Sequence, residues 1–344
     1  MIRVIGWDIG GANVKAARLL FTDGRAESGR AVRRYFELWN KREGLHPLLQ
    51  EIHSDLGSAD AMVLTMTGEL CDAFHDRAEG VAYIIDAVRE AVPGIPLYAV
   101  DLDGRLVRLD GGEVDLLTIA ATNWIAEARV LASRQPDCLM MDIGSTTTDL
   151  IPILDGKLAA QGKRDIERLA RGELIYTGAL RTPVAAIVSQ IPMRGVICRI
   201  SAEYFAISAD VYLALGRLKP EDYTCATPDG REKTKEGALR RLARVACEDS
   251  KHLTAGELHA LAAYIAEKQL QQITEGMLHV LSRIENGFRL PVVSVGIGAF
   301  LGEACARRLN LTTCDPPALT DSGSVTLSPC AAAAYLLGQA LSHG

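Results

Sequence analysis

Apolar runs alternate with amphipathic stretches along most of this 344-residue chain. Runs rich in Val, Ile, Leu and Ala predict buried strands, and apolar residues three or four positions apart predict helices. In the first part of the chain the expected strands are residues 2–9, 14–21, 30–38, 61–67 and 97–101, and the expected helices are residues 45–56, 81–92 and 116–133. Strands that alternate with helices in this way indicate an α/β domain.

The alternation starts again after Gln135-Pro136-Asp137, three residues typical of a loop. The expected strands there are residues 138–142, 148–154, 157–160 and 291–295, and the expected helices are residues 201–215, 236–249, 257–285, 301–309 and 329–341. We therefore expect two domains, residues 1–134 and residues 135–344, the second with a helical insertion at about 201–287. The last helix either belongs to the second domain or packs back on the first.

Composition and charge limit the functions that this chain can have. Hydrophobic residues make up 48% of it, enough to fill two cores, and no apolar run reaches the roughly 20 residues of a membrane span. The net charge of −6 lacks the basic excess that a nucleic-acid-binding surface needs, and the charged stretch 231–244 is expected to be a solvated helix face. Eight scattered cysteines without a Cys-x-x-Cys pair, and no signal segment before the first strand, predict a soluble cytoplasmic protein with reduced thiols.

Two segments of the chain are nearly the same in sequence. One spans residues 5–15 and the other residues 139–149, and each has an apolar run, then Asp-Ile-Gly, then small or hydroxylated residues and a second apolar run. A glycine turn between two buried strands points backbone N–H groups outward, where they bind anions. Asp8 and Asp142, which lie 134 positions apart, can each hold Mg²⁺ directly or through water. The pair predicts a duplicated domain with a phosphate-binding cleft between its copies.

A third glycine-rich segment, Val295-Gly296-Ile297-Gly298-Ala299, follows a strand late in the chain. Together with the two Asp-Ile-Gly turns it resembles the two phosphate motifs and the nucleoside-side motif of the acetate and sugar kinase, actin and heat-shock chaperone superfamily. The resemblance implies an α/β fold of two ribonuclease-H-like domains with a cleft between them. Kinases use the third loop to approach adenine and ribose, and a transferase could reuse it, so Gly296 and Gly298 are candidate substrate-binding residues.

Four more segments narrow the resemblance. Together with the two turns they resemble hydantoinase/oxoprolinase-related proteins of the tetrahydromethanopterin-linked one-carbon pathway, and the likeness spans nearly the whole chain. The four segments are residues 64–70, 122–124, 172–184 and 227–234. In the first of them Gly68 precedes Glu69, where the family leads us to expect a small residue such as Ala. This branch includes an enzyme of methanofuran biosynthesis that joins a furfuryl diphosphate to γ-glutamyltyramine.

The resemblance implies a transferase that releases pyrophosphate and uses Mg²⁺ as its cofactor. Its substrates would be an aminomethyl-furfuryl diphosphate and the phenol oxygen of γ-glutamyltyramine or a tyrosine analogue, with neither nucleic acid nor membrane as a partner. Asp8 and Asp142 would hold the Mg²⁺, and Lys15 would meet a phosphate edge. The residues expected to bind the diphosphate oxygens are Gly10, Gly11, Asn13, Gly144, Ser145, Thr146 and Thr147.

The acceptor phenol needs a base, because its pKa of about 10 leaves it protonated at neutral pH. Glu69 follows the strand at 61–67, at the strand end that lines the ligand-binding edge of open α/β sheets, and is the candidate base. A surface carboxylate at a helix start is the alternative for Glu69. Arg181 is the candidate for the glutamyl carboxylate and Arg194 a weaker one, because guanidinium groups match carboxylates in bidentate geometry. The alternative for both is an ordinary surface or packing arginine.

Two other functions stay open at this point. An ATP-dependent kinase or amidohydrolase would use the same two turns and the third loop for a nucleotide. A nucleotide-sensing protein would retain the cleft but would catalyse no reaction. The presence of Asp8, Asp142, Lys15 and Glu69 together counts against the non-catalytic alternative.

Overall fold

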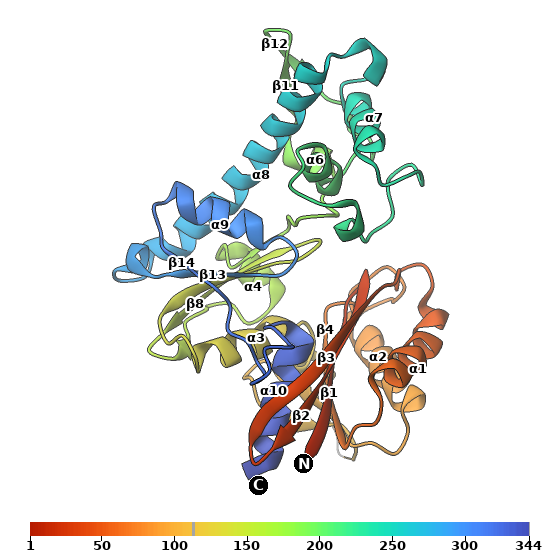
Figure 1. Ribbon diagram of the computed structural model, residues 1–344, viewed down its shortest axis with the longest axis vertical. Helices are drawn as coiled ribbons and strands as arrows, with labels where there is room; N and C mark the ends of the chain where they lie inside the picture. Colours follow the sequence, from red (N-terminus) through yellow and green to blue (C-terminus); the bar gives the residue numbers. More distant parts are fainter. Residues whose placement is uncertain (112–113, 344) are drawn as a thin grey trace. The chain divides into compact units, whose positions relative to one another are not determined.

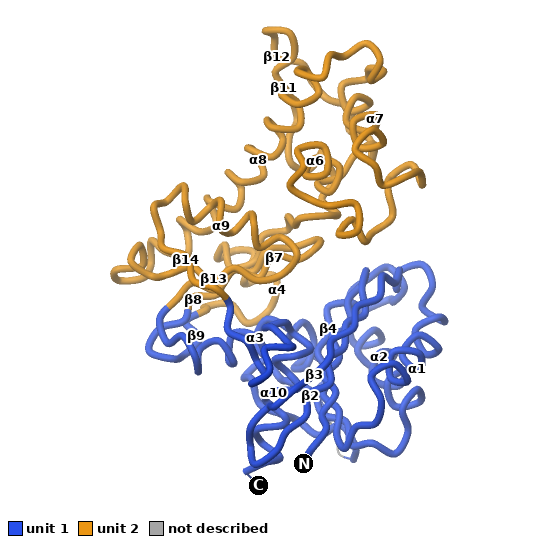
Figure 2. Tube along the Cα trace, viewed as in Figure 1, with its two compact units in different colours: residues 1–137, 153–159, 316–344 blue, residues 138–152, 160–315 orange. Residues whose placement is uncertain are grey.

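The computed structural model describes residues 1–111 and 114–343, which form two compact units (Figure 2). Unit 1 consists of Met1–Asp137, Ile153–Ala159 and the chain from Pro316 onward, and unit 2 consists of Cys138–Pro152 and Ala160–Asp315. The expected second domain, residues 135–344, therefore loses residues 135–137, 153–159 and the chain from Pro316 onward to unit 1. The largest of these segments ends in the last helix, which packs against the sheet of unit 1.

Unit 1 is built on a six-stranded sheet with the order β3-β2-β1-β4-β5-β6 (Figure 1). Its strands are β1 (Ile2–Ile9), β2 (Asn13–Thr22), β3 (Arg25–Tyr35), β4 (Ala61–Met66), β5 (Leu97–Val100) and β6 (Leu106–Arg108). β1 runs antiparallel to β2 and parallel to β4, so the carboxyl ends of β1 and β4 lie at the same edge of the sheet. β3 starts earlier than expected because Asp23 and Gly24, both with positive φ, form a tight hairpin turn with β2.

Helices cover both faces of this sheet. They are α1 (Leu45–Leu56), α2 (Arg77–Ala91), α3 (Asn123–Ala132) and α10 (Pro329–His343), with 3-10 turns at Arg42–Gly44 and Leu116–Thr118. Ile5, Trp7 and Ile9 of β1 enter the core that α1 and α2 share. The alternate residues face α10, where Gly6 is required because a Cβ there would lie 1.9 Å from the Cys330 carbonyl oxygen. Side chains on β1 thus divide between two cores. Asp8, two residues after Gly6, is on the face of β1 that meets α10.

The helix expected at residues 116–133 is wrong in its first half. The chain forms only a 3-10 turn at Leu116–Thr118, and α3 begins at Asn123. Ala121 has a φ of 52°, which ends the helical path, and the Thr122 hydroxyl donates a hydrogen bond to the Val100 carbonyl. The hydrogen bond from the Thr122 side chain to β5 thus prevents the helix that the spacing of the apolar residues predicts.

Unit 2 carries most of a second sheet, with the order β10-β8-β7-β13-β14 and β9 paired to β8. Its strands are β7 (Cys138–Ile143), β8 (Thr148–Leu154), β9 (Lys157–Leu158), β10 (Leu174–Ile175), β13 (Val292–Val295) and β14 (Thr313–Cys314). Asp155 and Gly156, both with positive φ, form the hairpin turn between β8 and β9. β13 runs parallel to β7, which puts the loop after Val295 beside the end of β7.

The rest of unit 2 is mainly helical. Its remaining elements are α4 (Asp165–Ala170), α5 (Val184–Ile187), β11 (Gln190–Met193), β12 (Val196–Arg199), α6 (Ser208–Ala214), α7 (Lys235–Val245), α8 (Ala255–Ser282) and α9 (Ala299–Arg308), with 3-10 turns at Pro220–Asp222, Ser250–His252 and Gly287–Arg289. The long helix expected at 257–285 is confirmed as α8. The helix expected at 201–215 starts only at Ser208, because Ile207 bridges to Pro183 and the Asp210 carboxylate accepts the Ile207 N–H. None of the helices in the described residues is both long and apolar enough to span a membrane.

A buried charge cluster joins α6 to α7, contrary to the solvated helix face expected at 231–244. Arg241 is fully buried and donates from Nε to Asp210 Oδ1 at 2.9 Å, and from Nη1 to Asp229 Oδ1 at 3.2 Å. The Tyr223 hydroxyl donates to the same Asp210 oxygen at 3.0 Å. Arg244, on the exposed side of α7, pairs with Asp229 at 3.1 Å. These arginines hold the loop at 227–231 in place.

Arg241→Met is expected to lower the free energy of unfolding by about 3–5 kcal/mol, because it leaves the buried carboxyl group of Asp210 without its cationic partner. Arg244→Met is the matched control, since it removes a partly exposed pair with Asp229 and should cost no more than about 1 kcal/mol. Urea denaturation of both variants measures the difference. Equal losses in the two variants would contradict a special role for the buried pair.

Candidate functional site

The first Asp-Ile-Gly turn connects β1 to β2 in unit 1. The Gly10 N–H donates to the Asn13 carbonyl at 2.9 Å and closes the turn. Gly68, after β4, packs against this turn: a Cβ there would lie 3.0 Å from the Gly10 carbonyl carbon and 2.8 Å from Leu38 Cδ2. This close approach favours glycine before Glu69, because the methyl group of Ala would require Leu38 to shift and would lie tight against the Gly10 backbone.

Asp8 is 3% exposed and lies at the turn, on the face of β1 that meets α10. Its Oδ2 accepts a hydrogen bond from Lys15 Nζ at 3.0 Å, across the β1–β2 pair that puts the two residues opposite each other. Its Oδ1 is buried and accepts no hydrogen bond from any described residue. A buried carboxylate oxygen without a donor is costly unless a cation or water binds it.

Two contacts at the first turn could not be predicted from the sequence. Cys330, at the start of α10, lies close enough for the negative charge of Asp8 to act on its thiol. Burial chiefly, and then Asp8, raise the Cys330 pKa to about 11, so the thiol stays protonated at neutral pH. Arg33 on β3 donates to Asn13 Oδ1 at 3.2 Å and fixes the side chain that was expected to meet phosphate. Neither contact has a local sequence signal, because both join segments distant in the chain.

Glu69 is 1% exposed and lies in the turn that follows β4, beside the first Asp-Ile-Gly turn. Its Oε1 lies 3.6 Å from Nε of Arg77, the first residue of α2. Its backbone packs against α2, where a Cβ at Gly80 would lie 2.0 Å from the Glu69 carbonyl oxygen. The alternative of a surface carboxylate at a helix start is therefore wrong, since α2 begins later, with Asp76 as its N-cap.

The second Asp-Ile-Gly turn connects β7 to β8 in unit 2. The Gly144 N–H donates to the Thr147 carbonyl at 2.9 Å, the same bond that closes the first turn. Asp142, at the end of β7, is 9% exposed, and residues 144–147 are each partly exposed. The two turns thus share a geometry as well as a sequence. Each offers a carboxylate and a small-residue loop at the end of a buried strand.

The segment at 177–182 packs directly on the second turn. The Arg181 N–H donates to the Ser145 carbonyl at 2.8 Å, and Arg181 Nη1 lies 3.3 Å from Thr146 Oγ1. Arg181 therefore sits beside the hydroxyls of the turn. A Cβ at Gly178 would lie 2.5 Å from the Thr146 nitrogen, which accounts for the glycine. Arg194, by contrast, lies in the β11–β12 hairpin and pairs with Glu257 at 2.6 Å.

A buried glutamine on α8 holds that segment in position. Gln269 is 1% exposed; its Nε2 donates to Thr177 Oγ1 and to the Gly178 carbonyl, each at 2.8 Å. The Tyr212 hydroxyl donates to Gln269 Oε1 at 2.7 Å. Side-chain hydrogen bonds thereby connect the second turn to α6 and α8, and no local sequence motif predicts them.

The third glycine loop follows β13 and packs against Asp142. Gly296 has a φ of 84°, and a Cβ there would lie 2.6 Å from Asp142 Oδ1. The Gly298 N–H donates to the Ile143 carbonyl at 2.8 Å, and a Cβ at Gly298 would meet the Ile143 side chain at 2.3 Å. Both glycines are therefore needed to bring the start of α9 against the second turn, whatever ligand the loop contacts.

No group of three His, Cys, Asp or Glu side chains able to hold a metal ion occurs in residues 1–111 and 114–343. Mg²⁺ does not need such a group, because it commonly binds through one or two carboxylates, water and the phosphates of a substrate. The buried Asp8 Oδ1 without a hydrogen-bond donor fits a ligand to such an ion. The residues present are thus compatible with Mg²⁺ brought in with a phosphate compound.

Each sheet carries an Asp-Ile-Gly turn at the end of a central strand, an α/β arrangement like the one that the resemblance to the acetate and sugar kinase, actin and heat-shock chaperone superfamily implies. The structure of a nucleotide-free acetone carboxylase, from work on ATP-dependent acetone carboxylation, has this fold. It superposes with a TM-score of 0.58 at 12% identity, covering 96% of this chain and 70% of that one. At this identity the likeness concerns the fold alone.

The chain belongs to the hydantoinase/oxoprolinase family, whose profile matches residues 60–337. It is similar to the (4-{4-[2-(gamma-L-glutamylamino)ethyl]phenoxymethyl}furan-2-yl)methanamine synthase of Methanocaldococcus jannaschii, with 38% identity over 298 residues that cover 86% of each chain. The synthase of the same name from Methanococcus vannielii is 38% identical over 163 residues, 47% of this chain and 71% of that one. Both relatives are synthases by name, which identifies this chain as an enzyme.

Proposed function

We propose that this protein joins an aminomethyl-furfuryl diphosphate to the phenol oxygen of γ-glutamyltyramine, or of a tyrosine analogue, and releases pyrophosphate. The observation that carries the proposal is the 38% identity to the Methanocaldococcus jannaschii synthase over 86% of both chains. The product named for that relative contains the phenoxymethyl-furan ether that such a transfer would form. Methanofuran or a bacterial analogue would then be the end product of the pathway.

In this proposal the two glycine turns bind the diphosphate. Their backbone N–H groups and the hydroxyls of Ser145, Thr146 and Thr147 suit phosphate oxygens, and partial exposure of residues 144–147 leaves them accessible. Lys15 and Arg181 add positive charge at the first and second turn respectively. We assign Arg181 to this end of the substrate, in place of the glutamyl carboxylate expected at first, because its guanidinium lies beside Thr146.

Asp8 and Asp142 would hold Mg²⁺, which supplies positive charge that neutralises the diphosphate as it leaves. The protein's own residues then orient that diphosphate and keep the acceptor in line with the reacting carbon. Fixed donors of this kind are worth about 3–4 kcal/mol each when charge develops in a closed site.

The covalent step exchanges one carbon–oxygen bond for another. The bond from the furfuryl methylene to the diphosphate breaks, its electron pair leaves with pyrophosphate, and the furan oxygen stabilises the positive charge on the carbon. The phenol oxygen forms the new bond, and its proton passes to the Glu69 carboxylate. Glu69 suits this role because it is a carboxylate beside the first turn, and the phenol must reach a side chain that is 2% exposed in the free protein.

Incubation with (5-aminomethylfuran-2-yl)methyl diphosphate, γ-glutamyltyramine and Mg²⁺ tests the proposal. We expect one equivalent of pyrophosphate for each equivalent of ether product. A pyrophosphate-release assay measures the first, and mass spectrometry measures the second. Product formation only in the presence of ATP, with ADP or phosphate released in equal amount, would overturn it in favour of the ATP-dependent alternative.

Mg²⁺-pyrophosphate is expected to stabilise the protein more than Mg²⁺-ATP at the same concentration, and ATP hydrolysis is expected to be absent with or without γ-glutamyltyramine. A ligand at about 100 times its Kd adds roughly 2.7 kcal/mol, which raises the melting temperature by several degrees. Mg²⁺ alone is the control for the ion. A larger shift with ATP would mean that the site binds a nucleotide.

A further inference from the structure

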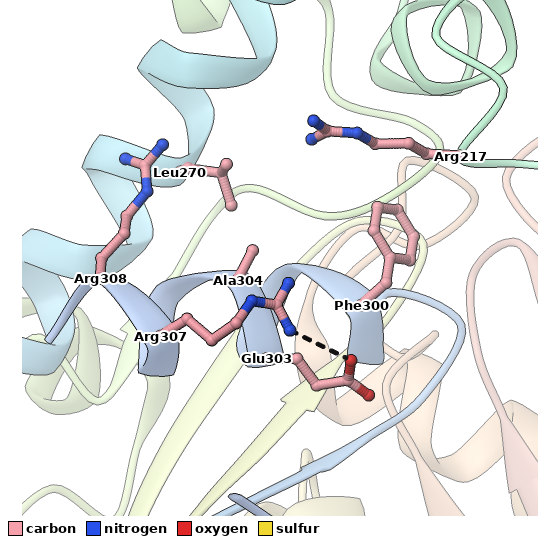
Figure 3. Close-up of a pocket in the computed structure, with 7 residues that line it drawn as sticks. All are labelled: Arg217, Leu270, Phe300, Glu303, Ala304, Arg307 and Arg308. Carbon is pink, nitrogen blue, oxygen red and sulfur yellow. Dashed lines mark ion pairs between the residues drawn. The ribbon is translucent and has the colours of Figure 1, made fainter. Parts of the chain in front are cut away.

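A groove in unit 2 combines guanidinium groups, a carboxylate and apolar side chains. Its volume is about 670 Å³, within the range of roughly 300–1,000 Å³ typical of small-molecule sites. The lining residues are Arg217, Leu270, Phe300, Glu303, Ala304, Arg307 and Arg308. Figure 3 shows that the side chains of Arg217, Phe300 and Arg307 point into the same space.

One side of α9 supplies most of this groove. Phe300, Glu303, Ala304, Arg307 and Arg308 are spaced by three and four residues and so form a single stripe along the helix. α8 contributes Leu270, and the chain after α6 contributes Arg217. Because α9 rises about 1.5 Å per residue, Arg307 lies roughly 10 Å along the helix axis from Phe300.

The charges of the groove are only partly paired with one another. Arg308 pairs with Glu267 on α8, and Arg307 lies 3.8 Å from Glu303 in a long, exposed pair. Arg217 is exposed and ion-pairs with no carboxylate of the described residues. The groove therefore offers two guanidinium groups to an anion and one carboxylate to a cation, within one helical stripe.

Phe300 forms a fixed apolar wall at the end of the groove nearest the second turn. Its ring meets that of Tyr212 edge to face, with centroids 5.1 Å apart and an angle of 78°. Tyr212 is in turn bonded to Gln269, which holds the segment against Thr146. Phe300 also lies two residues after Gly298, whose N–H is bonded to the strand that carries Asp142.

We propose that this groove binds the α-amino-acid end of the phenolic substrate. Arg217 and Arg307 bind its α-carboxylate, Glu303 binds its α-ammonium group, and Phe300 and Leu270 contact its carbon chain. An α-amino acid carries one negative and one positive group on the same carbon, which matches the charges of the groove. The proposal rests on the proposed function, and it assigns the carboxylate to residues for which the sequence has no motif.

The orientation of the substrate follows from the position of α9. Phe300 lies two residues after Gly298, whose N–H donates to the Ile143 carbonyl just before the second turn, and Arg307 lies about two helical turns farther along α9. γ-Glutamyltyramine has its phenol at one end and its amino-acid group at the other. The groove thus holds the glutamyl end at Arg307 and directs the phenol toward the turn that carries Asp142.

Substrate analogues that lack one charge each test the assignment. Glutaryl-tyramine lacks the α-amino group, and 4-aminobutanoyl-tyramine lacks the α-carboxylate. We expect Arg217→Gln to weaken binding of γ-glutamyltyramine and glutaryl-tyramine about 10-fold and to leave 4-aminobutanoyl-tyramine unchanged. Glu303→Gln should do the reverse, weakening only the two compounds that keep the amino group. Calorimetry gives Kd, and steady-state kinetics should show the change in KM with kcat unaltered.

Arg199→Gln, an exposed arginine of the β11–β12 hairpin in the same unit, is the matched control and should bind all three compounds as the wild type does. If the wild type forms product and Arg217→Gln binds γ-glutamyltyramine normally, the inference is overturned while the proposed function stands. If the wild type forms no ether but binds γ-glutamyltyramine, and Arg217→Gln weakens that binding, the groove is supported and the proposed reaction is wrong.

Discussion

Asp142→Asn and Asp8→Asn are each expected to lower kcat/KM at least ~10³-fold while the protein stays folded. Each Asp stands beside a glycine turn at a strand end, and Asn keeps the shape of the side chain but loses the charge that would hold Mg²⁺. Asp8→Asn also removes the charge partner of Lys15, whose Nζ lies 3.0 Å from Asp8 Oδ2. Pyrophosphate release at saturating Mg²⁺ measures the activity.

Asp101→Asn is the matched control for these two variants. Asp101 is 9% exposed, as Asp142 is, and follows strand β5 of the unit 1 sheet, but its Oδ1 accepts the backbone N–H groups of Asp103 and Arg105. It should lose stability and keep its activity per folded molecule. Near-native turnover in either turn variant would exclude that Asp from the metal site. A fall in melting temperature well beyond about 4 °C, the effect of roughly 1 kcal/mol, would point to a structural role.

Glu69→Gln is expected to reduce kcat at pH 7 by ~10²–10⁴-fold, the usual effect of removing a general base. Gln keeps the size of the side chain and one acceptor oxygen, but it cannot take the proton of the phenol. The loss should shrink as the pH approaches the phenol pKa of about 10, because the acceptor then ionises in solution. Pyrophosphate release from pH 6 to 10 measures the profile.

Glu127→Gln provides the comparison, because Glu127 is also 1% exposed in unit 1, on α3. Its variant reports the effect of an amide in place of a buried carboxylate and should show no recovery at high pH. An equal loss for Glu69→Gln at every pH would assign Glu69 to positioning. Unchanged kcat with reduced stability would leave the Glu69–Arg77 pair as a structural contact that joins the turn to α2.

The sequence alone determines the parts of this protein that depend on local patterns. Buried strands followed by Asp-Ile-Gly predict both turns, and each turn closes with the same backbone hydrogen bond. The hairpin at Asp155-Gly156 and the long α8 follow from turn chemistry and apolar spacing. The catalytic and metal-binding roles of Asp8, Asp142 and Glu69 stay predictions, because they concern ligands.

Tertiary contacts decide what local patterns leave open. Residues 116–121 have helical spacing, yet the bond from Thr122 to β5 and the positive φ of Ala121 prevent the helix. The last helix joins unit 1 because Gly6 lets its backbone approach β1, and a Cβ at Gly68 would crowd Leu38 and the backbone of the first turn. Arg217 meets the stripe of α9 although more than 80 residues separate them in the chain. Such contacts join distant segments, and their free energy depends on a fold that no short stretch of sequence contains.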